Sequence, residues 1–327
     1  MLNEVAMYRF QTGFFPFSHE LDPKEIIQGK GWTVSFEEVE TSLPWSSKDS
    51  YQAVLHARTL ETASNAFNLI GAAITLRNDG FLTETPYFPL PEDERLLEKI
   101  IQKYGHEAYT HSTCGIGFIP DGVRIAARAS NSMDYQYALL KYRMGCFTHS
   151  LPSVEIDPSY ATEHLGKVAF RDVHIILASS IVTFYSVIEQ LELEVRASAS
   201  CPSRMNGKWN PPVFIDITRR LRLAGIDVEQ PSVWVQRGKS TTVGSVALKN
   251  VQATKAPWSR GLYVRDKFID VRDAILAASN LRSKVSSHRL DPKKVSALTA
   301  YDAENVRILA RRLLLTSLGC RIFEVAE

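Results

Sequence analysis

Arginine and histidine are the side chains whose spacing in this chain suggests chemistry. Arg282 and His288 lie near the C-terminal end with five residues between them. A histidine can transfer protons near neutral pH, and an arginine presents a fixed fork of donors to phosphate oxygens. Together they could promote attack of an RNA 2′-hydroxyl on the neighbouring phosphate without a metal ion. We therefore expect no cofactor and no metal at this site.

A similar spacing occurs at Arg143 and His149. The chain has 23 arginines and 8 histidines, so chance supplies roughly one or two such pairs, and the surrounding segments must decide between them. Arg282 and His288 stand at the junction of two predicted helical segments in a basic stretch. We find no such helical setting around Arg143 and His149, and we interpret that pair as coincidence.

The C-terminal arrangement resembles the HEPN superfamily, small helical bundles many of which are metal-independent ribonucleases. The resemblance covers about 165–320. It rests on a long first helix ending FYSVIEQLELEV, a helix bearing Asp273, Ala278 and Leu281, the Arg282/His288 pair, and a last helix containing ARRLLL. Two features depart from the family pattern. Ser283 follows the arginine where the family often has Asn or Asp, and the segment DPKKVSALTA separates the pair from the last helix.

The resemblance implies an endoribonuclease of the toxin or antiviral-effector type, whose site is composed at the interface of a homodimer. Its partners would be RNA and a partner protein or antitoxin. Glu189, on the first helix, would orient Arg282 or His288. Other interpretations stay open: Arg282 and His288 could bond backbone carbonyls at a helix end, and Glu189 could be a buried carboxylate paired with another arginine. The protein could also be a non-catalytic HEPN-type scaffold that binds RNA or protein.

Basic side chains near the motif are candidates for holding the RNA backbone, because phosphate contacts give affinity without sequence choice. These candidates are Arg260, Arg265, Lys284, Arg289, Lys293 and Lys294. Trp209, Trp234 and Trp258 could stack on bases or simply pack in the core.

The N-terminal half offers a different chemistry. Zinc takes histidine and cysteine ligands, and this half contains His106, His111, Cys114, Cys146 and His149. A metal-dependent hydrolase is therefore a second alternative.

Composition and charge place limits on the class of protein. Hydrophobic residues make up 45% and charged residues 23% of the 327, which is typical of a globular protein. Four scattered cysteines, no membrane-spanning run and no secretory signal favour a cytoplasmic protein. Residues 1–162 hold 13 Lys and Arg against 20 Asp and Glu, net −7, whereas 163–327 hold 25 against 16, net +9. This asymmetry suggests two bodies, the second in contact with a polyanion, or two halves that attract each other.

The predicted fold class is α+β, with a mixed N-terminal domain followed by a mainly helical HEPN-like bundle. We expect an α+β sensor or specificity domain over 1–160 and the helical domain over 161–327, divided at the polar, proline-containing stretch 149–163. Alternation of apolar residues predicts a strand within 31–40, and glycines suggest a hairpin within 106–130. Helices are predicted over 51–77, 133–148, 168–196, 212–225, 266–284 and 299–317.

Overall fold

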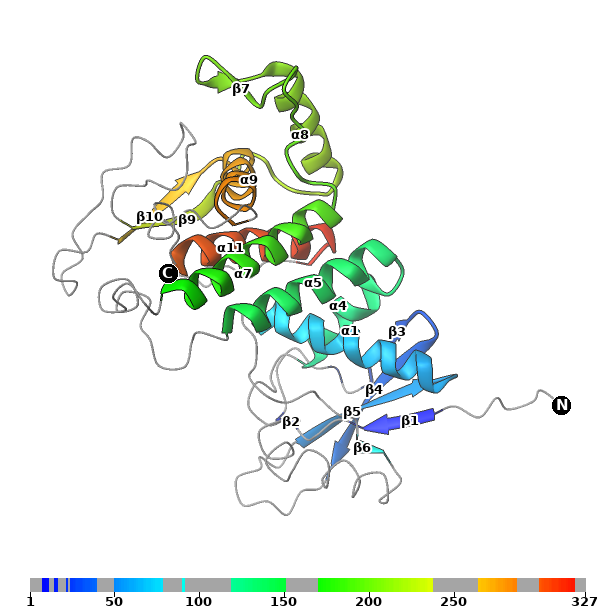
Figure 1. Ribbon diagram of the computed structural model, residues 1–327. Helices are drawn as coiled ribbons and strands as arrows, with labels where there is room; N and C mark the ends of the chain where they lie inside the picture. The colour runs from blue at the N-terminus through cyan, green and yellow to red at the C-terminus, as the bar shows by residue number, and fades with distance from the viewer. Residues whose placement is uncertain are drawn as a thin grey trace. The chain divides into compact units, whose positions relative to one another are not determined.

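The computed structural model describes residues 8–11, 15–16, 22, 24–39, 50–78, 90–91, 119–150, 170–237, 264–286 and 300–320. Helices and small antiparallel sheets alternate along the chain, so the α+β class is confirmed (Figure 1). The chain divides into two compact units, Met1–Leu140 and Lys141–Glu327. The boundary expected near residue 160 lies outside the described residues and stays a prediction.

The first unit is built on an antiparallel sheet. Its strands are β1 (Tyr8–Gln11), β2 (Phe15–Pro16), β3 (Ile27–Gly29), β4 (Trp32–Val39), β5 (Ser50–Ala57) and β6 (Leu90–Pro91). They lie in the order β3-β4-β5-β1-β6, and β2 pairs with the beginning of β5. Trp32, Val34 and Phe36 of β4 are buried at alternate positions, which confirms the predicted strand.

The segment 51–57 is a strand and not the beginning of a helix. Tyr51, Ala53 and Leu55 are buried on one face of β5, and Val54 is buried on the other. A strand covered on both faces is apolar throughout, so its sequence cannot be told from a helix by periodicity alone. The helix α1 (Leu60–Asn78) begins only after Thr59, whose hydroxyl accepts a hydrogen bond from the Thr62 amide at 3.1 Å.

The hairpin expected within 106–130 is wrong where the structure describes this segment, because Ile119–Ala129 forms the helix α4. Gly122, which suggested a turn, lies where α4 crosses α1. A Cβ atom there would come within 2.4 Å of Ile74, so the glycine permits close helix packing. Asp121 of α4 pairs with Arg77 of α1 at 2.7 Å. Both helices cover the same face of the sheet (Figure 1).

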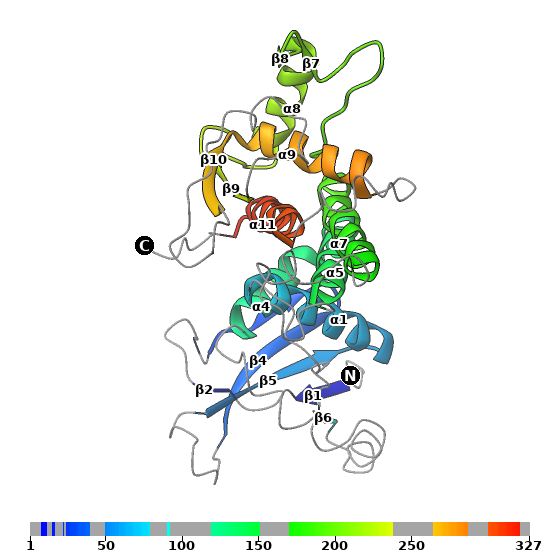
Figure 2. The same ribbon diagram turned by 60° about the vertical axis from the view of Figure 1, so that its left-hand side comes forward.

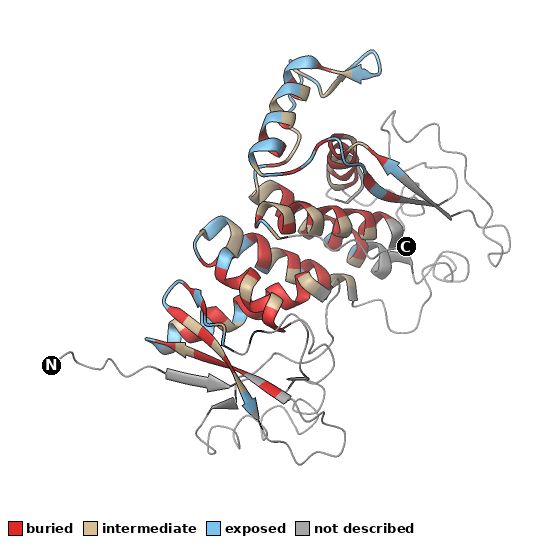
Figure 3. Cartoon of the chain, turned by 180° about the vertical axis from the view of Figure 1, so that it is seen from behind, coloured by how far each residue is buried: buried red, intermediate tan, exposed pale blue. Residues whose placement is uncertain are grey.

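The second unit contains three long helices. They are the C-terminal part of α5 (Met133–Ser150), α7 (Phe170–Gln190) and α11 (Ala300–Ser317), and all three were predicted. Gly145 of α5 packs against Phe184 of α7. The buried sides of α7 and α11 face each other (Figure 3). The helix α7 ends six residues before the expected 196, and Glu192 just beyond it has a left-handed φ of 56°.

The rest of the described second unit consists of shorter elements. They are the hairpin β7 (Arg204–Met205) and β8 (Lys208–Trp209), the helix α8 (Pro211–Leu223), the ribbon β9 (Ser232–Arg237) and β10 (Val264–Ile269), the helix α9 (Val271–Asn280) and the π-helical segment η4 (Leu281–Ser286). Of these elements, η4 and α9 contact α7. Figure 2 shows that α9 and η4 lie across the C-terminal end of α7. The helix predicted to begin at 266 is α9, which begins five residues later because Val264–Ile269 forms strand β10.

Candidate functional site

Arg282 is positioned by an irregular helix end. The side chain of Asp270 caps α9 by accepting a hydrogen bond from the Arg272 amide at 2.8 Å. At Leu281 the α-helix passes directly into η4, whose wider π-helical turn contains Arg282. The Ser283 hydroxyl donates to the Ser279 carbonyl at 2.6 Å across this junction. Single π-helical turns are rare and often accompany functional sites.

Arg282 contacts two side chains of α7. Its Nη2 atom lies 3.4 Å from Oε1 of Glu189, and its guanidinium lies 5.9 Å from the centroid of the Tyr185 ring. The structure therefore brings Arg282 and Glu189 together, as one of the open interpretations anticipated. Their side chains are 40% and 38% exposed, so Glu189 is not the buried carboxylate of the other interpretation.

Tyr185 is a member of this cluster that the sequence analysis did not single out. Burial raises the pKa of its phenol to about 12, and the charge of Glu189 adds to this, whereas a hydrogen bond with Ser279 and the charge of Arg282 oppose it. The phenol is therefore neutral at physiological pH and supports the arginine with its ring. The available signal was the spacing of Tyr185 and Glu189, four residues apart on one helix face.

Arginine offers hydrogen-bond donors of the kind that suit an anion. A half-exposed arginine–glutamate pair is worth only about 0–1 kcal/mol, so a phosphate group could replace Glu189 at the guanidinium at little cost. His288, the expected proton-transfer group, lies outside the described residues. The same holds for Arg260, Arg289, Lys293 and Lys294. The backbone of Arg265 lies in β10 and that of Lys284 lies in η4, two residues after Arg282.

The second arginine–histidine pair has a helical setting after all, which corrects the expectation from sequence. His149 lies in the second unit, where its Nε2 atom is 3.5 Å from Oε2 of Glu304 on α11. Its ring meets Phe184 of α7 edge-on at 6.3 Å. Arg143 and His149 are six residues apart on α5, so at 100° per residue their side chains point about 120° apart. The two side chains do not form one site.

Glu304 is expected to make stability depend on pH. Burial raises its pKa, but hydrogen bonds from Arg307 and His149 and their charges outweigh burial and lower the pKa from 4.5 to about 2. A lowered carboxyl pKa contributes stability above pH 4.5 that is lost as the pH falls toward 2. Allowing for partial exposure, we expect this contribution to be on the order of 2 kcal/mol. Urea unfolding at pH 6 and pH 3 should show a smaller stability difference in Glu304→Gln than in the parent protein. Equal differences in the two proteins would contradict this assignment.

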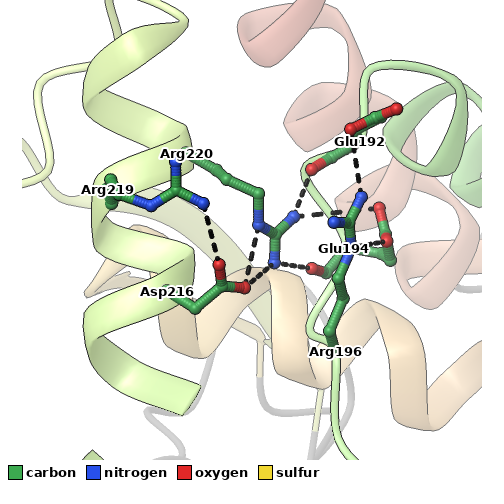
Figure 4. A network of polar contacts seen from close by, with 6 residues as sticks. All are labelled: Glu192, Glu194, Arg196, Asp216, Arg219 and Arg220. Carbon is green, nitrogen blue, oxygen red and sulfur yellow. Dashed lines mark hydrogen bonds and ion pairs between the residues drawn. The ribbon is translucent and has the colours of Figure 1, made fainter. Parts of the chain in front are cut away.

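A buried arginine organises the chain just after α7. Arg220 of α8 donates to Oδ2 of Asp216 at 3.0 Å, to the Glu194 carbonyl at 2.8 Å and to the Glu192 carbonyl (Figure 4). The hydrogen bond from Arg220 is the main cause of the lowered pKa of Asp216. The contacts of Arg220 are satisfied within the protein, so this network is structural. Arg219, next to it in the helix, is 62% exposed and pairs with Asp216 at 3.2 Å.

Of the three tryptophans considered for base stacking, the two that the structure describes are packed. Trp234 is 2% exposed. Trp209 donates from Nε1 to Oδ1 of Asp273 at 2.9 Å, and Arg204 lies over its ring at 5.2 Å and pairs with the same carboxylate. This contact fastens the β7–β8 hairpin to α9. Packing rather than base stacking therefore accounts for both residues, whereas Trp258 lies outside the described residues.

Known proteins give no independent assignment, because comparison with family models, curated proteins and solved structures finds no match to this chain. Within the described ranges, no helix is long and apolar enough to cross a membrane. The same ranges contain no cluster of three or more side chains suited to a metal ion. Of the expected metal ligands, Cys146 is buried and His149 contacts Glu304. His106, His111 and Cys114 lie outside the described residues.

Proposed function

We propose that this protein is a metal-independent endoribonuclease of the HEPN type. The observation that carries the proposal is the half-exposed guanidinium of Arg282, held at a π-helical turn by Glu189 and supported by Tyr185 of a neighbouring helix. It presents a phosphate-binding group on rigid elements of the basic half of the chain. In this proposal Arg282 and His288 are catalytic, and Glu189 positions Arg282 before substrate binds.

The reaction would proceed by internal transfer. His288 removes the proton from a ribose 2′-hydroxyl, and the oxygen attacks the adjacent phosphorus. The bond from phosphorus to the 5′-oxygen breaks, and that oxygen takes a proton from a second histidine, which the same motif of another copy would supply. Arg282 faces the nonbridging oxygens, where charge accumulates in the transition state. The products carry a 2′,3′-cyclic phosphate and a 5′-hydroxyl.

The remaining parts of the proposal concern the cellular setting. The basic residues named from sequence would hold the RNA backbone, and the site would be completed in a homodimer. The N-terminal half would act as the sensor or specificity module of a cytoplasmic toxin or antiviral effector, controlled by a partner protein or antitoxin. These roles rest on the resemblance to the HEPN superfamily, which supports fold more strongly than function.

A non-catalytic scaffold that binds RNA or protein is the second candidate. It is favoured by the ion pair itself, because Glu189 already occupies donors of Arg282 that catalysis requires. The two candidates differ in one property: only the first would break RNA.

Cleavage should not require a metal ion. We expect the purified full chain to cut single-stranded RNA at the same rate with and without excess EDTA, because the proposed groups move protons without a Lewis acid. The new ends should be 2′,3′-cyclic phosphate and 5′-hydroxyl, which end-labelling and mass spectrometry distinguish. Loss of cleavage in EDTA would favour the metal-dependent alternative. Binding without any cleavage would favour the scaffold.

A further inference from the structure

The ion pair between Arg282 and Glu189 is a loose contact. The Nη2 atom of Arg282 lies 3.4 Å from Oε1 of Glu189, which is beyond the roughly 2.7–2.9 Å of a charge-assisted hydrogen bond. Arg272, on the preceding helix α9, holds its carboxylate more closely, because its Nε atom donates to Oδ1 of Asp270 at 2.7 Å. Glu189 therefore restrains the guanidinium of Arg282 only weakly.

Both members of this pair are open to solvent. The side chain of Arg282 is 40% exposed and that of Glu189 is 38% exposed, whereas the side chain of Arg272 is 8% exposed. An exposed ion pair contributes little, because water competes for both charges. A more strongly bound anion that arrives from solvent can therefore take the place of the carboxylate.

Arg282 is also held by contacts that do not involve the carboxylate of Glu189. Its guanidinium lies 5.9 Å from the centroid of the Tyr185 ring, and Tyr185 is only 3% exposed. The Tyr185 hydroxyl forms a hydrogen bond with Ser279, near the end of α9 that leads into η4. Leu281, adjacent to Arg282 in the chain, is fully buried. The backbone and ring contacts can therefore stay in place while the guanidinium changes its anion.

The RNA backbone is an anion that can compete with this carboxylate. Each phosphodiester offers two nonbridging oxygens to the donor fork of an arginine. The half of the chain that contains Arg282, residues 163–327, holds 25 Lys and Arg against 16 Asp and Glu, so a run of phosphates is attracted as a whole. A single carboxylate on a helix side chain has no such additional attraction.

We propose that Glu189 is an internal competitor that RNA must displace from Arg282. In the free protein the carboxylate neutralises the guanidinium. In the complex a phosphate takes its place, Glu189 turns away from the repelling phosphate, and the guanidinium stays over the Tyr185 ring. The pair thus lowers the affinity of the site for RNA. This exchange rests on the proposed function in that its ligand is RNA, but it does not depend on whether the RNA is then cut.

RNA binding by the full chain tests the exchange. The probe is a fluorescent single-stranded RNA with 2′-O-methyl riboses, which lacks the attacking hydroxyl and so keeps cleavage out of an anisotropy measurement. Glu189→Gln should tighten binding about fivefold, because the phosphate no longer has to replace an exposed ion pair. Glu192→Gln is the matched control. It removes the same charge just beyond α7, from a side chain that is 75% exposed and pairs with Arg196, and it should change binding by less than about twofold.

A double-mutant cycle assigns the gain to the arginine. In an Arg282→Gln background Glu189→Gln should have no effect, and Arg282→Met replaces that background if Arg282→Gln does not fold by circular dichroism. Three results would overturn the exchange: no gain in Glu189→Gln, a gain that persists without Arg282, or an equal gain in Glu192→Gln. Absence of RNA binding in every variant would also overturn it. Failure of the proposed function gives a different result, because unmodified RNA would then stay intact while the gain and its dependence on Arg282 remain and support the exchange.

Discussion

His288→Ala should slow RNA cleavage by roughly a hundred- to ten-thousand-fold, the usual loss when a general acid or base is removed. The fold should survive, because His288 lies in the polar sequence SSHRLDP and truncation of such residues usually changes stability by a few tenths of a kcal/mol. Single-turnover cleavage of a labelled RNA and thermal unfolding of the same preparations check both statements. Arg282→Ala should reduce the rate in the same direction through loss of phosphate stabilisation.

Two control variants keep this test specific. Arg219→Ala removes an exposed arginine from α8 and should leave cleavage unchanged, in contrast to Arg282→Ala. His149→Ala should also leave cleavage unchanged, although its contact with Glu304 means that some stability will be lost. Assays should therefore be run well below its unfolding temperature. Full activity of His288→Ala would rule out the proposed site. An equal loss of cleavage in His288→Ala and His149→Ala would show either that the catalytic residues lie elsewhere or that both substitutions disturb the fold.

Arg220→Ala should lower the free energy of unfolding by about 3 kcal/mol. Arg220 is 7% exposed. Its removal leaves the carbonyls of Glu192 and Glu194 without this donor, and Asp216 keeps only its exposed partner Arg219 among the described residues. Each buried acceptor left unsatisfied costs about 1–3 kcal/mol, and water entering the space recovers part of that cost. Urea unfolding followed by circular dichroism measures the change.

Arg219→Ala provides the matched control for this second prediction. It deletes the same side chain one residue away on the same helix, but from an exposed position, and should cost less than about 0.5 kcal/mol. Losses of similar size in the two variants would show that the effect is helix propensity or net charge. In that case the buried hydrogen bonds of Arg220 would not be the cause.

The long helices could be predicted from sequence because each buries a stripe at helical spacing. The last helix, for example, buries Val306, Leu309, Ala310 and Leu313. It ends at Ser317, two residues before Gly319, whose φ is 66°. Two errors in the first unit have one physical origin. In both cases a local sequence pattern depends on tertiary packing. The run in β5 is apolar because β5 is a central strand, and Gly122 permits close contact between helices and does not form a turn.

The candidate site could be predicted only in part. Glu189 was proposed because it lies on the long first helix of the resemblance, and the structure places it beside Arg282. Tyr185 was missed because its four-residue spacing from Glu189 places it on the same helix face but does not show that a cation will lie over its ring. The hydrogen-bond network of Arg220 was missed because its main partners are backbone carbonyls, which every residue has and no sequence pattern distinguishes.

The two glycines at helix contacts have a consequence for the evolution of this chain. A methyl group at Gly122 would collide with Ile74, and one at Gly145 would collide with Phe184, at 2.4 and 2.6 Å. Even the smallest substitution would therefore require the packed side chain, or the helix that carries it, to shift. Surface arginines and histidines can be substituted when selection on their chemistry relaxes. The two glycines, in contrast, are constrained by helix packing in every protein that keeps this fold. Distant relatives that have lost the Arg282/His288 pair should therefore still be recognisable by glycine at both positions.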